Sequence, residues 1–441
     1  MYKLISDSLC NYARSLLLLI TILITCHLSS AENDIIVSLS TNTELTPISL
    51  EVSEDAAFPA SYYKSFNSVL SFDLNHNALT QIVKKSNVAY SLKVDIIDKQ
   101  LTALLTSTTK NTIKKVGPIT LSGRLAEDRK QIHQLADFVH KAISGKDGIA
   151  TTKVLYTVKV PNEDPTYKSK WVSEVWESDY DGANAKQITH EGRYCVTPVY
   201  LAPKPGFAPG SFFYVSYIIG QPKIYVASLK TGKGYRLTSL RGNQLMPAIT
   251  KARDAVAFIC DLAGNPDLFL QPFDPEVGAV GKPRQIYATM KGTQGSPTFS
   301  PDGKQVAFVS NKDGNPRVYV MAIPPEGLEA KEMKPVLISK YNKESTSPCW
   351  SPDGTKLAYS SMTSGSRQIW IYDFLTKKEE QLTKGLGNKE NPSWAPNSLH
   401  IVFNNDLDNE LYIVNPHQTE SVKVSCGSGE KRFPCWEPKT K

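Results

Sequence analysis

The sequence predicts a mainly β protein in which a six-bladed β-propeller follows a small α/β domain. The main evidence is a three-residue phrase, a proline, any residue and a bulky apolar residue, that recurs six times at intervals of 42 to 51 residues. This period is typical of a four-stranded propeller blade and is too long for β-helix coils or leucine-rich repeats. The second line of evidence is that the two ends of the array are incomplete in complementary ways. The six prolines are Pro198, Pro247, Pro297, Pro348, Pro392 and Pro434.

Each repeat contains the pattern of four strands, A to D. The proline phrase belongs to strand A and precedes a turn, which reads Ser-Pro-Asp-Gly at 300–303 and 351–354. Proline presets φ in such a turn and glycine ends it. Alternating apolar residues then predict strand B, for example at 305–308, and a second run after a polar turn predicts strand C, for example at 317–320. Strand D ends in short motifs such as Arg-Leu-Thr at 236–238.

The first repeat lacks strand A, and the last repeat stops after it. Segments 153–156, 174–176 and 187–189 supply strands B, C and D, whereas 433–436 supplies an A strand alone. We therefore expect the last A strand to pair with the first B strand. That pairing would close the ring and remove exposed sheet edges, which otherwise promote aggregation.

The residues before the repeats predict the α/β domain. Its clearest helix has apolar residues on one stripe at 3.6-residue spacing, and Gly145 supplies a stop. The last predicted strand would form a hairpin across a turn at 98–100. The predicted strands are 35–39, 88–97 and 101–106, and the predicted helices are 61–74 and 125–144.

The amino terminus has the pattern of a cleavable export signal. Basic residues flank the start of an apolar run at 16–24, and small residues at 29–31 predict cleavage after Ala31. A membrane anchor is disfavoured because the run is much shorter than the roughly 20 residues that span a bilayer. Lipid attachment at Cys26 is disfavoured because Thr25 stands where a smaller residue is usual.

The predicted organisation is a signal peptide at 1–31, the α/β domain at 32–150 and the propeller at 151–441. Because no other segment could cross a membrane, we expect a soluble, monomeric protein of an oxidising compartment such as the gram-negative periplasm. Five cysteines would remain, an odd number without C-x-x-C spacing, so disulfides are allowed but cannot be assigned, and zinc is not indicated. They are Cys195, Cys260, Cys349, Cys426 and Cys435.

Charge and motifs exclude several classes of function. Residues 32–150 hold 13 basic and 13 acidic side chains, and residues 151–441 hold 35 and 29. These basic residues are scattered rather than gathered into a stripe with aromatics, so a nucleic acid partner is not expected. The sequence contains no Gly-x-Ser-x-Gly elbow, His-Glu-x-x-His motif or phosphate-binding loop. We expect no cofactor and no enzymatic activity.

Two groups of possible metal ligands have a simpler interpretation. His133, Asp137 and His140 follow an i, i+4, i+7 spacing that could converge on a metal, but they lie beside the apolar stripe, where a solvated flank is expected. Asp-Tyr-Asp-Gly at 179–182 looks like the start of a calcium loop but lacks the later ligands and the closing glutamate. We expect a turn between strands C and D there, and no bound metal.

The repeats of the Trp-Ser-Pro-Asp-Gly type, the phrase Glu-Ser-Asp-Tyr-Asp-Gly at 177–182 and the terminal Phe-Pro-x-Trp resemble the TolB family. The resemblance is strong over about residues 153–438. It implies a non-catalytic periplasmic adaptor of the Tol-Pal system that binds the peptidoglycan-associated lipoprotein Pal, maintains envelope integrity and supports outer-membrane constriction at division. It also implies a contact between the mature amino terminus and TolA, here through Glu32, Asn33, Asp34, Ile35 and Ile36.

The propeller fold suggests where a partner binds. The connections from strand D of one blade to strand A of the next surround one mouth of the central channel, and we term them the collar. A closed ring positions the collar before a partner arrives, which lowers the entropy cost of binding. The resemblance assigns Pal to this mouth. The candidate residues are Arg193, Tyr194, Asn243, Gln244, Met246, Gly295, Ser296, Lys431 and Arg432.

An alternative function is a carbohydrate-binding or carbohydrate-cleaving propeller of the envelope. It would require aromatic platforms and a pair of carboxylates facing the channel. Sequence spacing across a propeller does not reveal such a pair, so this alternative stays open at this point.

Overall fold

The computed structural model describes residues 45–84, 88–328 and 330–439. The predicted signal peptide, its cleavage site, the strand at 35–39 and the five residues proposed for a TolA contact lie outside these ranges. None of the helices within the ranges is long and apolar enough to span a bilayer. Residues from Glu44 to Lys441 cluster as one compact unit, so a domain boundary near residue 150 stays a prediction.

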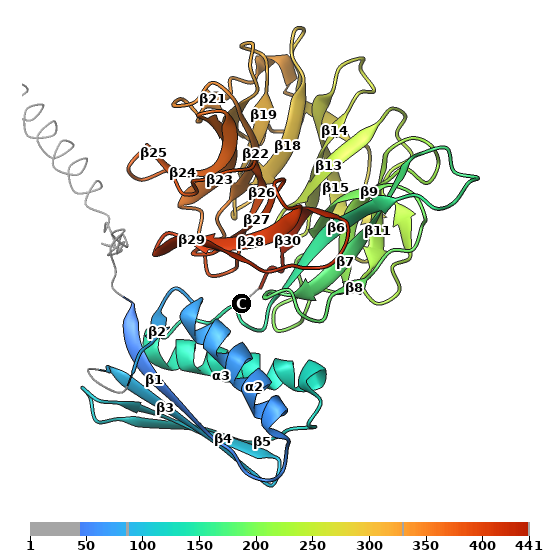
Figure 1. The fold of residues 1–441 in the computed structure, drawn as a ribbon. Helices are drawn as coiled ribbons and strands as arrows, with labels where there is room; N and C mark the ends of the chain where they lie inside the picture. Colours follow the sequence, from blue (N-terminus) through green and yellow to red (C-terminus); the bar gives the residue numbers. More distant parts are fainter. Residues whose placement is uncertain (1–44, 85–87, 329, 440–441) are drawn as a thin grey trace, which may run out of the picture. The chain divides into compact units, whose positions relative to one another are not determined.

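The first part of the fold is a five-stranded sheet with two helices on one face (Figure 1). In β3 and β4, side chains alternate between buried and more exposed positions, so one face of the sheet packs against the helices. The helices bury Phe66, Leu70, Leu135 and Val139 in this core. In sheet order the strands are β2 (Thr80–Ile82), β1 (Thr46–Ser53), β3 (Tyr90–Ile97), β4 (Gln100–Ser107) and β5 (Ile113–Thr120), and the helices are α2 (Ala60–Asn75) and α3 (Leu125–Ser144).

Both predicted helices, the β3–β4 hairpin and the left-handed stop at Gly145 are confirmed. Strands β1, β2 and β5 were not predicted. β1 pairs in parallel with both β2 and β3, so it lies inside the sheet, whereas β5 is an edge strand with mostly exposed side chains.

The second part is a six-bladed ring, as predicted, with the strand order A-B-C-D in every blade (Figure 1). Blade 1 joins β30 (Glu430–Trp436), β6 (Lys153–Pro161), β7 (Trp171–Asp179) and β8 (Lys186–Gln187). Blade 2 joins β9 (Cys195–Tyr200), β10 (Ser211–Ser216), β11 (Lys223–Ser228) and β12 (Gly234–Arg236). Blade 3 joins β13 (Gln244–Ile249), β14 (Ala255–Cys260), β15 (Asp267–Asp274) and β17 (Arg284–Tyr287), with the short β16 (Gly278–Ala279) also beside β15.

The remaining blades follow the same plan. Blade 4 joins β18 (Gln294–Phe299), β19 (Gln305–Ser310), β20 (Arg317–Ala322) and β21 (Val336–Leu337), with the 3₁₀ turn η1 (Ala330–Glu332) before β21. Blade 5 joins β22 (Ser345–Trp350), β23 (Lys356–Thr363), β24 (Ser366–Asp373) and β25 (Lys378–Gln381). Blade 6 joins β26 (Lys389–Trp394), β27 (Ile401–Asn405), β28 (Glu410–Asn415) and β29 (Gln418–Lys423).

The ring closes as the sequence predicts. The last strand, β30, pairs antiparallel with β6, from Glu430 opposite Lys159 to Trp436 opposite Val154. The indole of Trp436 donates a hydrogen bond to the buried Thr152 hydroxyl at 2.8 Å. Beyond the strand, the backbone N–H of Lys153 donates to the carboxylate of Glu437 at 2.8 Å. This pairing covers the edge that β6 would otherwise expose.

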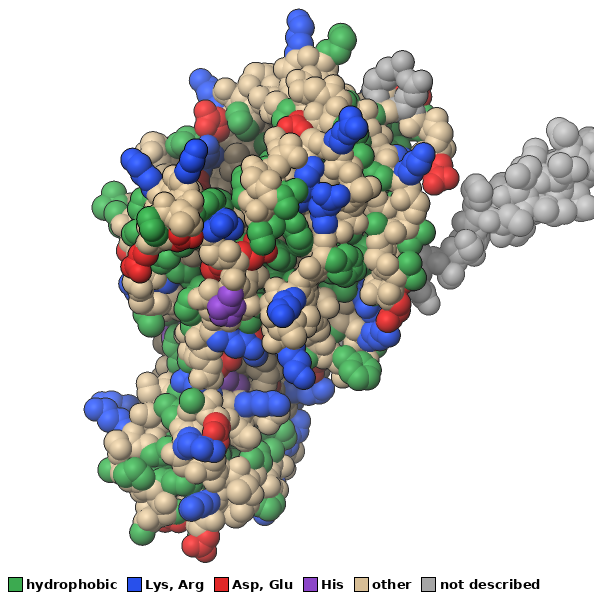
Figure 2. All heavy atoms as spheres, turned by 90° about the vertical axis from the view of Figure 1, so that its right-hand side faces the viewer, with side chains coloured by type: hydrophobic (Ala, Val, Ile, Leu, Met, Phe, Trp, Pro, Cys, Tyr) green, Lys and Arg blue, Asp and Glu red, His purple; other side chains and the backbone are tan. Residues whose placement is uncertain are grey.

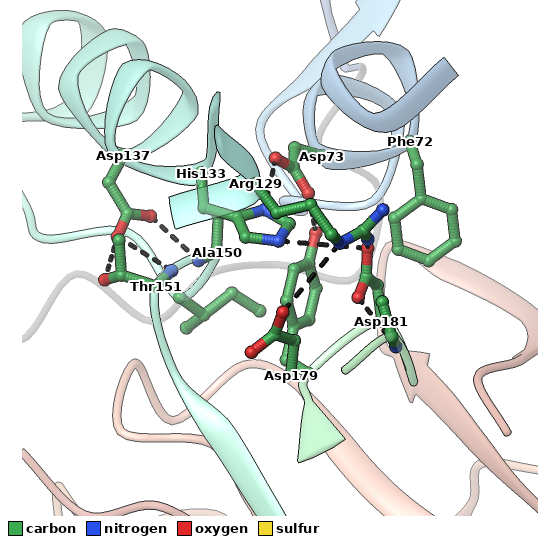
Figure 3. A network of polar contacts seen from close by, with 12 residues as sticks. Phe72, Asp73, Arg129, His133, Asp137, Ala150, Thr151, Asp179 and Asp181 are labelled. Carbon is green, nitrogen blue, oxygen red and sulfur yellow. Dashed lines mark hydrogen bonds and ion pairs between the residues drawn. The ribbon is translucent and has the colours of Figure 1, made fainter. Parts of the chain in front are cut away.

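Both helices bind the turn after β7 through a buried polar network (Figure 3). At its centre Asp73 of α2, 1% exposed, accepts hydrogen bonds from the Tyr180 hydroxyl at 2.6 Å and from His133 Nδ1 at 2.8 Å. Arg129 of α3 pairs with Asp181 and lies 3.8 Å from Asp179. The guanidinium of Arg129 and the imidazole of His133 thereby join the carboxylates of Asp73, Asp179 and Asp181.

The expectation that His133, Asp137 and His140 form a solvated flank is wrong for the histidines. His133 is 3% exposed and His140 5%, because this side of α3 is covered by other parts of the fold. The three residues do not converge on one point either, since the Asp137 carboxylate is engaged by the backbone N–H groups of Ala150 and Thr151. Burial opposes a charge on His133, but the hydrogen bond and charge of Asp73 outweigh it and raise the pKa of this imidazole.

Burial lowers the pKa of four further histidines nearby, and the charges of three of them also lower the pKa of the fourth, His400. The most buried is His400 in the turn before β27. Its Nε2 lies 2.8 Å from the carbonyl oxygen of His76, and its Nδ1 lies 3.0 Å from the Asn397 amide. Burial lowers the pKa of His400 to about 3. The four are His76, His140, His400 and His417.

We expect acid to destabilise the fold through His400. Its folded pKa lies below its unfolded value of 6.5, so the stability present above pH 6.5 is lost as the pH falls through and below that value. The loss from this residue between pH 6.5 and 5 should be up to about 2 kcal/mol. Urea unfolding at pH 7.5 and 5.0 should show a loss of stability in the wild type that is smaller by about this amount in His400→Gln, where the other buried histidines still contribute. His190→Gln, at an exposed position, is the control, and an unchanged slope in His400→Gln would contradict the assignment.

Candidate functional site

Every A strand has a bulge at its repeat proline. In β13, for example, Leu245 pairs with Ile259 and Ala248 with Ala257, so Met246 and Pro247 together oppose the single residue Phe258. The same register shift occurs in the other five A strands. Proline has no N–H to donate, and a bulge is one of the few places where a strand tolerates it. The repeat proline of the sequence therefore marks a bulge in each blade.

The residue before each proline adopts a left-handed backbone conformation, although none of the six is glycine. This conformation costs an ordinary residue roughly 1 kcal/mol or more. Its repetition in all six blades gives six side chains equivalent positions around the channel. The residues and their φ angles are Thr197 (49°), Met246 (53°), Ser296 (44°), Ser347 (51°), Asn391 (54°) and Phe433 (53°).

These six residues and the six prolines line a cavity of about 610 Å³ in the channel. A second cavity of about 210 Å³ is lined by the bulky residues that end the repeat phrases, including Tyr200, Trp350 and Trp436. Cys349 and Cys435 lie in the channel wall as free thiols. The first cavity, at the collar end of the A strands, is the candidate site.

The third residue before each proline is buried in all six blades and supports the collar from inside. The ammonium of Lys389 donates to the carbonyl oxygens of Leu386 at 2.7 Å and Gly387 at 3.2 Å. The Gln244 amide donates to the Leu240 carbonyl at 2.9 Å. The six residues are Cys195, Gln244, Gln294, Ser345, Lys389 and Lys431, each at most 6% exposed.

This pattern changes the interpretation of two candidate residues. Gln244 and Lys431 were chosen because they precede a repeat proline, but both are buried and hold backbone. Lys431 also pairs with Glu410 at 3.1 Å. Neither side chain is available to a partner at the surface. Counting back from each proline along the alternation of strand A would have revealed this.

The other candidate residues divide into channel-lining and outer positions. Met246, Gly295, Ser296 and Arg432 line the cavity. Asn243 lies outside the lining, where the Asp261 carboxylate accepts hydrogen bonds from its backbone and its amide at 2.7 Å. Arg193 and Tyr194 also lie outside it, in the connection between blades 1 and 2. Ser347 and Asn391 lie in the segments that the sequence assigns to the collar, whereas Thr197 and Phe433 were not predicted, although their place before the proline is the signal that identifies them.

One side of the mouth is neutral. Met246 is 36% exposed, and its sulfur accepts a hydrogen bond from the backbone N–H of Ser296 at 3.0 Å. A β-carbon on Gly295 would lie 3.7 Å from the same sulfur, an ordinary van der Waals distance, so Met246, Gly295 and Ser296 are direct neighbours in this stretch of the wall. An apolar thioether beside small polar groups suits a partner that brings an uncharged surface.

The opposite side carries a chain of ion pairs that links blades 5, 6 and 1. Arg432 lies 3.7 Å from Glu390 and 3.2 Å from Glu430, and Glu390 in turn lies 3.5 Å from Arg367. Burial alone would raise the pKa of Glu430, but Lys159 and Arg432 lower it. Three of the candidate residues of the collar, Arg193, Lys431 and Arg432, are basic. Here, however, carboxylates balance its arginines, so this side combines both signs of charge.

A group of metal-ligand type lies elsewhere, in the network beneath the ring. Asp73, His133 and Asp181 bring three ligand atoms within 4.8 Å of one another. Arg129 is paired with Asp181, and Tyr180 and His133 already use both oxygens of Asp73. The contacts are those of a structural ion network.

Comparisons with known proteins agree on one family. The model described as "TolB beta propeller domain" matches residues 140–440. A "Protein TolB homolog" of Protochlamydia amoebophila is 50% identical over 386 residues, which cover 82% of each chain. Another from Chlamydia pneumoniae is 36% identical over 80% of this chain and 79% of its own. The crystal structure of TolB from Acinetobacter baumannii has the same fold, with a TM-score of 0.71 and 19% identity over 90% of this chain and 98% of that one.

Replacing Thr197 by glycine should stabilise the protein. Thr197 is β-branched, has φ of 49° and has a buried hydroxyl without a hydrogen-bond partner in the described part of the chain. Glycine removes both penalties, and we expect a net gain of about 1 kcal/mol after the entropy cost of glycine. Guanidinium unfolding measures it. Val199→Gly, two residues along the same strand, should instead destabilise, and equal losses in both variants would refute the strain argument.

Proposed function

The chain belongs to the TolB family, and on this premise we propose that it is a non-catalytic adaptor of the Tol-Pal system whose channel mouth binds the lipoprotein Pal. Through this contact it would help maintain envelope integrity and outer-membrane constriction at division. It would act as a monomer in the periplasm after removal of residues 1–31. The segment Glu32–Ile36 would contact TolA.

One observation carries the proposal, namely the ring of six left-handed residues at the channel mouth. Strained backbone that recurs at a cavity is more typical of a binding surface than of a packing device. The positions are set by strand pairing and by buried side chains such as Lys389 that hold the loops. A partner would therefore meet a rigid surface and lose little ordering entropy there.

The neutral side of the mouth is the proposed centre of the contact. Met246, Gly295 and Ser296 are direct neighbours and supply a partly apolar wall, and such walls form the cores of protein interfaces. Arg193, Tyr194 and Asn243 would belong to its periphery. Arg432 would present a charge already paired with Glu430 and Glu390. Gln244 and Lys431 would act indirectly by supporting their loops.

A carbohydrate-cleaving propeller is less well supported. Glycoside hydrolysis requires two carboxylates that flank the bond. Among the described residues that line the larger cavity, Glu390 is the one acidic residue, and it is paired with two arginines. The aromatic residues at the second cavity belong to the packed repeat phrases. This arrangement favours protein binding over sugar chemistry.

Bulky changes at the centre of the mouth should abolish capture of Pal. Met246→Trp and Ser296→Trp would each obstruct the wall, and we expect the dissociation constant to rise about 100-fold. Titration calorimetry with the soluble domain of Pal from the same organism measures this. Leu375→Trp, an equally bulky change at an exposed turn between β24 and β25, is the control. Wild-type affinity in both mouth variants would rule out this site.

A further inference from the structure

Blade 1 carries a longer hairpin than the other blades at the collar end. Strands β6 and β7 form nine paired positions, and the connection between them runs from 162 to 170 (Figure 1). The B–C connections of blades 2, 3 and 4 span 217–222, 261–266 and 311–316, and those of blades 5 and 6 are shorter. We term residues 162–171 the arm.

The arm is held in one conformation by its own hydrogen bonds. The Asn162 amide donates to three carbonyl oxygens of the loop, those of Asp164, Tyr167 and Ser169, at 2.8 to 3.0 Å. The Asp164 carboxylate accepts from the backbone and the hydroxyl of Thr166 at 2.8 and 2.6 Å. An exposed loop that is rigid without core packing is preorganised, and such loops often carry function.

Two cations attach the arm to the rim of the mouth. The Arg193 guanidinium lies over the Tyr167 ring at 4.4 Å and 3.8 Å from Asp164. The Lys159 ammonium lies over the Trp171 ring at 4.5 Å and pairs with Glu430 at 3.0 Å. Glu430 also pairs with Arg432 of the channel lining, so the arm is continuous with the candidate site. Arg193 is thus a positioning residue for the arm.

The arm exposes an aromatic ring, that of Trp171, and two lysines, Lys168 and Lys170. Trp171 is 41% exposed. Lys168 and Lys170 are exposed and form no ion pair with the described residues. Of the two acidic residues of the arm, Asp164 is paired with Arg193, and Glu163 is exposed and forms no ion pair with the described residues either. On the face that Figure 2 shows, Lys and Arg side chains are scattered over the surface rather than gathered into one patch. Tryptophan is enriched at contact surfaces between proteins, and lysines at the rim of such a surface act mainly by speeding association with an acidic partner.

We propose that the arm is a second docking surface for the partner that occupies the mouth, and that it contacts acidic side chains beside an apolar patch on a folded domain. This inference rests on the proposed function. A peptide that only entered the channel would not reach the arm, whereas a domain seated on the mouth would extend beyond the rim. The lysines increase the association rate with an acidic surface, and the indole supplies the buried contact.

The test compares the arm with the mouth in the full mature chain. The double variant Lys168→Glu/Lys170→Glu and the single variant Trp171→Ala should each raise the dissociation constant for the soluble Pal domain about 10-fold at 50 mM salt. At 500 mM salt the effect of the double variant should vanish because charges are screened, and that of Trp171→Ala should persist. The control is Lys230→Glu/Lys233→Glu, a charge reversal at exposed positions in the turn between β11 and β12. Unchanged thermal unfolding confirms that each variant is folded.

The outcomes separate the two proposals. Loss of affinity in both the arm and the mouth variants, with an inactive control, supports the second docking surface. Loss in Met246→Trp alone overturns the arm and leaves the proposed function intact. No loss in any variant overturns both. Loss in the arm variants alone overturns the mouth as the binding site and, with it, the arm as its extension.

Discussion

The antiparallel pairing of β30 with β6 is the interaction on which the molecule depends. It joins residues more than 270 positions apart, since Lys159 pairs with Glu430 at a separation of 271 residues. Without it, blade 1 would lack its inner strand and the channel would lack one sixth of its wall. The pairing also anchors Trp436, whose ring lies 6.4 Å from that of Tyr180 in the network that binds α2 and α3. One strand therefore supports the ring and its contact with the helices.

The mouth of the channel shows how a repeated local defect can build a surface. A bulge in each A strand releases the proline from the hydrogen-bond ladder and turns the preceding residue into the left-handed region. At the third residue before each proline, a buried side chain holds the collar in place. The backbone is thus six-fold repeated, while the side chains that it displays differ from blade to blade. The backbone fixes the positions of the six side chains, and the identity of each side chain determines what that part of the mouth can contact.

Much of the fold could be predicted from the sequence because the repeat encodes it directly. Prolines at a blade-length period and complementary ends predict a closed ring, and apolar spacing predicts α2 and α3. Strand β5 escaped prediction because Lys114, Lys115, Gly117 and Pro118 oppose a strand locally, so that pairing with β4 decides its conformation. The expected flank of α3 was wrong because spacing within a helix does not reveal what covers it. His133 is buried by residues that are distant in the chain.

The candidate site was predictable in place but only partly in detail. The position of the D–A connections follows from propeller topology, and Met246 and Ser296 do line the channel. The burial of Gln244 and Lys431 follows from strand alternation only once the repeat proline is known to lie in a bulge, and the structure is what shows that bulge. The charge balance of Arg432 likewise depends on Glu390 from another blade. Contacts between blades are the part of the site that local patterns do not encode.

The separation of 271 residues between Lys159 and Glu430 also has a consequence for biosynthesis. Strand β6 is synthesised before the other strands of the propeller and β30 after them. The inner edge of blade 1 therefore stays uncovered until almost the whole propeller has been made. Until then the ring is open, and strand pairing between residues so far apart in the chain forms slowly. A polypeptide truncated before residue 430 would leave the edge of β6 unpaired and accessible to chaperones and proteases. The ring can therefore close only after its last strand, β30, has been made.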